Sequence, residues 1–182
     1  MQITVRREPT SLVGSKRSVG SESPAVKVYN LSEEQVVVGM AAVKPQVFIV
    51  LPSLKTEVCS YGARKFNELL KGKDIFAYLV TTDDFLVCST FMQKNSISDV
   101  IITVDKDRDF GKKYGVLIED GHLKDKLARA VFIVDTEGFI KYTQIVSEVT
   151  DEADYDSALA AIDEVCRTLK KGSHHHEKWM GA

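Results

Sequence analysis

The sequence lacks the features that mark membrane-spanning, secreted and nucleic-acid-binding proteins. No apolar run approaches the roughly eighteen residues of a membrane-spanning helix. Residues 1–7 contain no apolar signal-peptide core. The net charge of -2 over 182 residues gives no basic surface for nucleic acid. We therefore expect a cytoplasmic protein that binds neither membranes nor nucleic acids.

Cysteine is also scarce, with only Cys59, Cys88 and Cys166 present. An odd number at unrelated spacings argues against a secreted disulfide framework and against a zinc cluster. The absence of any C-x-x-C motif disfavours a dithiol oxidoreductase. We therefore expect no metal and no cofactor, and at least one cysteine that stays unpaired within the chain.

Strand-like and helix-like segments alternate along the sequence. Residues 46–51 are apolar without interruption after the first, which is typical of a strand buried on both faces. Residues 2–13 alternate around a central Arg-Glu-Pro and predict a hairpin. Further strands are expected at residues 27–29, 36–38, 75–80, 100–104, 130–134 and 139–145, and helices at residues 57–71, 84–94, 110–114 and 150–171.

This order of elements predicts a three-layer α/β sandwich with a mixed sheet. The length and the 44% hydrophobic content suit a single core, so residues 1–171 are expected to form one domain. The last helix is expected to be capped by Thr150 or Asp151 and to end with Lys171. Residues 172–182 contain three adjacent histidines, which we interpret as a tag-like tail; a metal cluster is the alternative.

Cys59 is the strongest candidate for chemistry, because it lies where a buried strand gives way to a helix. The N–H groups at a helix N-terminus favour a thiolate over a thiol. A free cysteine with a pKa of about 8.5 is only ~3% thiolate at pH 7, so an efficient nucleophile needs such help. One nearby arginine would add enough. The alternative is a buried, inert thiol.

Pro52, Thr56 and Cys59 form the pattern P-x-x-x-T-x-x-C, with which the chain resembles the peroxiredoxins. Residues 51–54, 64–67 and 127–131 are similar to the bacterial thiol peroxidases, the atypical two-cysteine branch. The resemblance implies a thioredoxin-like fold with an added N-terminal β-hairpin and a homodimer. It also implies reduction of hydrogen peroxide and organic hydroperoxides, with thioredoxin or another thiol as the reductant.

The same resemblance implies a role for four residues. Cys59 resembles the peroxidatic cysteine, and Thr56 the hydroxyl that binds the peroxide oxygens. Pro52 resembles the ring that shields the thiolate, and Arg129 the guanidinium that holds both thiolate and peroxide. The chemistry agrees, because displacement at an O–O bond needs a thiolate in line with it and hydrogen-bond donors on the oxygens.

The chain departs from this family at the resolving cysteine, whose position is occupied by Met92. Methionine cannot form a disulfide. Cys88 is a possible substitute one helical turn earlier, but the shift of about 6 Å would require local unfolding. Two routes stay open for the oxidised Cys59: reduction by an external thiol, which we favour, and a disulfide with Cys88. Cys166 is expected to be a core residue of the last helix.

A second functional hypothesis follows from the same departure. A chain that has lost its resolving cysteine could be a non-catalytic redox sensor or binding module that retains the reactive-cysteine pocket. Repeated turnover of peroxide would distinguish the peroxidase from the sensor.

Overall fold

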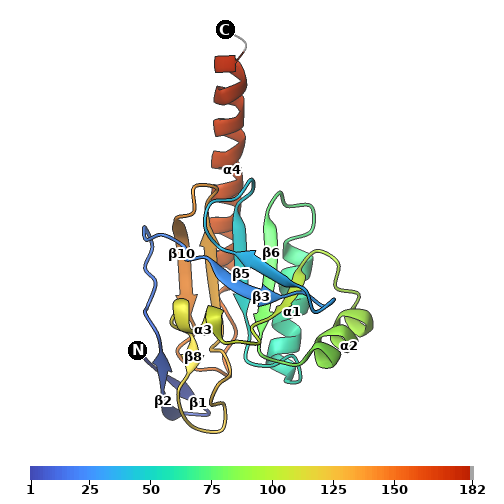
Figure 1. Cartoon of the computed structure of the whole chain (residues 1–182), viewed down its shortest axis with the longest axis vertical. Helices are drawn as coiled ribbons and strands as arrows, with labels where there is room; N and C mark the ends of the chain where they lie inside the picture. Colours follow the sequence, from blue (N-terminus) through green and yellow to red (C-terminus); the bar gives the residue numbers. More distant parts are fainter. Residues whose placement is uncertain (181–182) are drawn as a thin grey trace.

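A seven-stranded mixed sheet forms the centre of the molecule, in the strand order β10-β9-β5-β6-β7-β3-β4 (Figure 1). The computed structural model describes residues 1–180, with side chains over residues 1–168. The sheet consists of β3 (Val26–Tyr29), β4 (Gln35–Val38), β5 (Gln46–Val50), β6 (Phe76–Thr81), β7 (Ile101–Val104), β9 (Ala130–Val134) and β10 (Ile140–Ile145). A smaller sheet joins β1 (Gln2–Val5), β2 (Glu8–Val13) and β8 (Leu117–Ile118). The helices are α1 (Glu57–Leu69), α2 (Phe85–Asn95), α3 (Asp109–Lys113) and α4 (Tyr155–Met180).

Strand β5 lies in the middle of the large sheet, which explains its uninterrupted apolar sequence. It pairs parallel with β6 on one side and antiparallel with β9 on the other. All of its residues are buried, because both faces of the sheet are covered. Parallel pairing brings the C-terminal ends of β5 and β6 to the same edge, so the segments that follow them lie close together.

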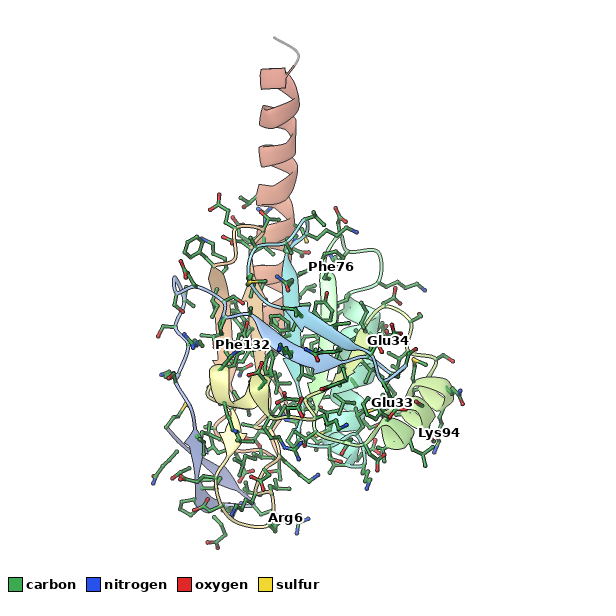
Figure 2. The ribbon with its side chains drawn as sticks, in the orientation of Figure 1. Arg6, Glu33, Glu34, Phe76, Lys94 and Phe132 are labelled. Atoms are coloured by element: carbon green, nitrogen blue, oxygen red, sulfur yellow. The ribbon has the colours of Figure 1, made fainter. Side chains whose placement is uncertain are left out.

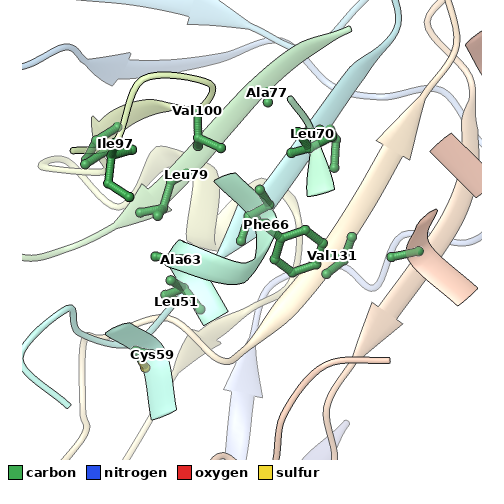
Figure 3. Packing of buried hydrophobic residues seen from close by; sticks show 14 of the residues in the cluster. Leu51, Cys59, Ala63, Phe66, Leu70, Ala77, Leu79, Ile97, Val100 and Val131 are labelled. Carbon is green, nitrogen blue, oxygen red and sulfur yellow. The ribbon is translucent and has the colours of Figure 1, made fainter. Parts of the chain in front are cut away.

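Alternate residues of β5 point into two separate cores. Val47 and Ile49 belong to the same core as Phe66 of α1 and Ile162 of α4. Figure 3 shows Phe66 beside Val131 in this core. Phe48 and Val50 face the other core, which holds α3 and the N-terminal hairpin. In Figure 2, Phe132 lies within the body of the molecule, whereas Arg6 and Lys94 lie at its periphery. The predicted α/β sandwich with a mixed sheet and an N-terminal hairpin is confirmed.

The last helix differs from the prediction at both ends. It begins at Tyr155, because the Asp154 carboxylate accepts hydrogen bonds from the backbone N–H (3.0 Å) and the hydroxyl (2.6 Å) of Ser157; Thr150 and Asp151 do not cap it. It continues to Met180, past Lys171, and its end projects beyond the sheet (Figure 1). The interpretation of residues 172–182 as a tail stays a prediction, since the histidine side chains lie outside the described ones. Strand β8 was not predicted.

Candidate active site

Cys59 lies in the first turn of α1 and is 1% exposed. Thr56 is the N-cap of this helix, and its hydroxyl oxygen accepts a hydrogen bond from the backbone N–H of Cys59 at 3.4 Å. The cap satisfies one of the unpaired N–H groups at the helix start. The Cys59 sulfur therefore lies at the positive end of the helix dipole, as the sequence predicted.

Arg129 completes the surroundings of the sulfur. Its Nη2 lies 3.2 Å from Cys59 Sγ, and its Nε and Nη2 donate to the carbonyl oxygen of Val149 at 3.3 and 3.0 Å. Arg129 as a whole is 3% exposed, and among the described residues it forms no ion pair with a carboxylate. A buried cation requires an anionic partner. Among the described side chains, the one that the guanidinium contacts is that of Cys59.

The loop that carries Pro52 is held by Asp83, a residue that the sequence analysis did not single out. Pro52 is buried directly after Leu51. The next two residues bind the Asp83 carboxylate: the Ser53 hydroxyl donates at 2.9 Å and the Leu54 N–H at 2.6 Å. Asp83 follows β6, so the parallel pairing of β5 with β6 brings it to this loop. The sequence signal that could have identified Asp83 is an acidic residue just after the strand that pairs with β5.

The Val149 carbonyl that accepts from Arg129 belongs to a loop that Glu148 holds in place. The Glu148 carboxylate accepts from the N–H of Arg7 (2.7 Å), the hydroxyl of Thr4 (3.0 Å) and the N–H of Thr150 (2.7 Å). The Val149 N–H donates to the Thr4 carbonyl. Partial burial opposes ionisation, but the N–H groups of Thr150 and Arg7 bring the pKa of Glu148 down to about 2. The N-terminal hairpin is thus bonded to the loop that orients Arg129.

Tyr155, in the first turn of α4, also lies beside the site. A Cβ on Gly62 would lie 3.4 Å from the Tyr155 hydroxyl oxygen and 3.8 Å from Arg129 Nη1. The absence of a side chain at Gly62 therefore leaves room for both groups. Burial, with the charge of Glu152, raises the pKa of Tyr155 to about 12, so its phenol is neutral and can donate a hydrogen bond.

Cys88 is a poor nucleophile in this structure. It lies in α2, fully buried, with its sulfur 4.0 Å from the Asp83 carbonyl oxygen. Burial, followed by the charges of Asp83 and Asp84, raises the pKa of Cys88 to about 12. Cys166, predicted to be a core residue, is half-buried and packs against the edge of the hydrophobic core that contains Cys88. Met92 packs against the same core as Cys88.

The arrangement suits nucleophilic chemistry at sulfur. It combines a buried thiol, a helix N-terminus, a guanidinium and a hydroxyl, which are the groups that stabilise a thiolate and the charge on a leaving oxygen. Within the described residues, no group of His, Cys, Asp and Glu side chains could hold a metal ion. In the same part of the chain no helix is both long and apolar enough to cross a membrane.

Comparisons with known proteins agree with this geometry. Residues 18–159 match the family model described as Redoxin. The thiol peroxidase of Aquifex aeolicus is 37% identical over 165 residues, which are 90% of this chain and 97% of that protein. The thiol peroxidase of Staphylococcus saprophyticus is 35% identical over 161 residues, 88% of this chain and 96% of that protein.

Solved structures agree as well. A peroxiredoxin-like protein from Aquifex aeolicus superposes with a TM-score of 0.87 at 37% identity, over 90% of this chain and 96% of that one. A peroxidoxin from Mycobacterium tuberculosis, at 19% identity and a TM-score of 0.69 over 82% of this chain and 98% of that one, shares the fold. The thioredoxin-like fold class is confirmed.

Proposed function

Since the chain belongs to the bacterial thiol peroxidases of the Redoxin family and is a thiol-dependent peroxidase, we propose that Cys59 is its peroxidatic cysteine. The observation that supports this assignment is the 3.2 Å contact between Cys59 Sγ and Arg129 Nη2. The guanidinium stabilises the thiolate, which is the form that attacks a peroxide.

In the proposed first step the Cys59 thiolate attacks one oxygen of the hydroperoxide. The S–O bond forms as the O–O bond breaks, and the leaving oxygen takes up a proton and departs as water or an alcohol. Cys59 is oxidised to a sulfenic acid and the peroxide is reduced. Arg129 and the hydroxyl of Thr56 stabilise the oxygens as charge develops, and the buried ring of Pro52 shields the sulfur from water.

In the second step a thiol attacks the sulfenic acid. A disulfide forms and water leaves, and a second thiol then releases Cys59 in its reduced form. The proposed reductant is thioredoxin or another thiol, and the proposed substrates are hydrogen peroxide and organic hydroperoxides. The rival hypothesis of a sensor without turnover is not favoured, because the similar curated proteins are thiol peroxidases. The cytoplasmic location and the homodimer stay predictions; light scattering on the purified protein would test the dimer.

Mass spectrometry after one equivalent of hydrogen peroxide tests the assignment of Cys59. With a sulfenic-acid trap such as dimedone present, we expect the adduct on the Cys59 peptide, and we expect none in Cys59→Ser. Cys88→Ser and Cys166→Ser are the matched controls, which should still form the adduct. Consumption of peroxide by Cys59→Ser at the rate of the unchanged protein would exclude the assignment.

A further inference from the structure

The proposed peroxidase needs a thiol that its own fold does not readily supply. Met92 has no thiol, and Cys88 is fully buried with its pKa raised to about 12. At pH 7 such a group is almost entirely in its thiol form, whereas an ordinary thiol is ~3% thiolate. Because the thiolate is the attacking species, an external thiol has the advantage over Cys88.

A groove between the start of α1 and α2 gives such a thiol a place to bind. Its volume is about 660 Å³, within the roughly 300 to 1,000 Å³ of small-molecule sites. Thr56 and Ser60 line one wall, on either side of Cys59 in the sequence, while Leu54 and Phe91 are among its apolar residues. Cys59 is not among the lining residues and is 1% exposed, so its sulfur reaches the groove only if the first turn of α1 opens.

The charges along the groove favour an anionic occupant. Lys55, Arg64 and Lys94 line it, and Glu57 is the single acid among the lining residues. Glu57 is bonded to Arg64 at 3.3 Å. In the part of the chain with described side chains, Lys55 and Lys94 form no ion pair. Two positive charges are therefore uncompensated beside the site, and such an excess attracts anions.

We propose that the reductant of oxidised Cys59 is a small thiol carrying a carboxylate or sulfonate, held in the groove between α1 and α2. The inference rests on the proposed function of Cys59. The thiolate of the bound molecule attacks the sulfenic sulfur, the S–S bond forms as the S–O bond breaks, and the oxygen leaves as water. A second molecule of the same thiol then attacks the mixed disulfide, which returns Cys59 as a thiolate and releases the oxidised thiol. Lys55 and Lys94 bind the anionic group.

Three thiols of different charge test this proposal. Cys59 is first oxidised with one equivalent of hydrogen peroxide, and the loss of sulfenic acid is then followed by stopped flow with 2-mercaptoethanesulfonate, 2-mercaptoethanol or cysteamine. Rate constants are corrected for the thiolate concentration of each thiol. We expect the anionic thiol to be about tenfold faster than the neutral one and the cationic thiol to be slowest. The difference should shrink as salt is added.

Variants that each remove one positive charge test which lysines cause the preference for the anionic thiol. Lys94→Gln and Lys55→Gln should each reduce the preference for 2-mercaptoethanesulfonate by severalfold. Lys112→Gln is the matched control, because Lys112 lies in α3 against the opposite core and should keep the preference. The yield of sulfenic acid before thiol is added is recorded for every variant. Absence of sulfenic acid would contradict the proposed role of Cys59, not the thiol site.

Three outcomes would overturn the thiol site. The first is equal corrected rates for the three thiols. The second is a disulfide between Cys59 and Cys88 that forms, with loss of one water, before any thiol is added. The third is reduction by thioredoxin with none by the small thiols.

Discussion

Arg129 Nη2 lies 3.2 Å from the sulfur of Cys59, a residue 70 positions earlier in the chain. The contact joins the residue before β9 to the first turn of α1, and the central position of β5 between β9 and β6 brings these segments together. The guanidinium is fixed by the Val149 carbonyl as well as by the sulfur.

Replacing Arg129 should remove most of the reactivity of Cys59. A hydrogen bond to a charged group contributes about 1.5–3 kcal/mol, which corresponds to roughly 10- to 150-fold in rate. Arg129→Met should therefore lose that factor both in kcat/KM for peroxide and in the rate of iodoacetamide alkylation at mildly acidic pH. Arg167→Met, on the exposed side of α4, is the control. Equal alkylation rates in both variants would contradict the thiolate assignment.

Thr56 is expected both to cap α1 and to bind the peroxide through its hydroxyl. Two variants distinguish the loss of this hydroxyl from a loss of side-chain volume. Thr56→Val should destabilise the protein by about 1 kcal/mol in denaturant titrations and should lower kcat/KM for peroxide. Thr56→Ser retains the hydroxyl and should restore both quantities. Failure of serine to restore turnover would show that the hydroxyl is not the active group.

Asp83 should influence Cys59 through the loop that it holds. Asp83→Asn can accept only one of the two hydrogen bonds from Ser53 and Leu54, so Pro52 should shift and kcat/KM for peroxide should fall. Asp84→Asn is the matched control, because asparagine caps α2 as well as the present aspartate does. Equal kcat/KM in the two variants would exclude a positioning role for Asp83.

Glu148 should make stability depend on pH. Its pKa is about 2 in the folded protein, below the ordinary value of 4.5, so its contribution is present above the ordinary value and is lost as pH falls toward 2. Glu148→Gln should lower stability at neutral pH and flatten the stability profile across that acidic range. Acid unfolding curves followed by circular dichroism would measure this. Glu137→Gln, in an exposed turn, should leave the profile unchanged.

Cys88 should contribute to packing and not to turnover with external thiols. Cys88→Ala removes a buried sulfur, so a loss of about 1 kcal/mol in stability is expected from the small cavity. The rate of peroxide turnover with 2-mercaptoethanesulfonate should stay within a factor of two. A larger loss of turnover, with sulfenic acid accumulating on Cys59, would identify Cys88 as the resolving cysteine.

Local patterns in the sequence predicted much of the fold and part of the site. The uninterrupted apolar run of β5 and the start of α1 at residue 57 depend on neighbouring residues, and both were found. Asp83, Glu148 and Tyr155 were missed, because their partners lie far away in the chain; Glu148 bonds to Arg7, for example, across 141 positions. The start of α4 was misplaced because several acids near it could serve as caps and only one does.

The hydrogen bonds between β1 and residues 147–149 have a consequence for biosynthesis. Thr4 is translated well before its partners Ser147 and Val149. During synthesis on the ribosome the Arg129 side chain therefore has no Val149 carbonyl to fix it, and the thiol of a nascent chain is not yet tuned for attack. The contact between Arg129 and Cys59 is therefore expected to take its final form only after residue 149 has been added to the chain.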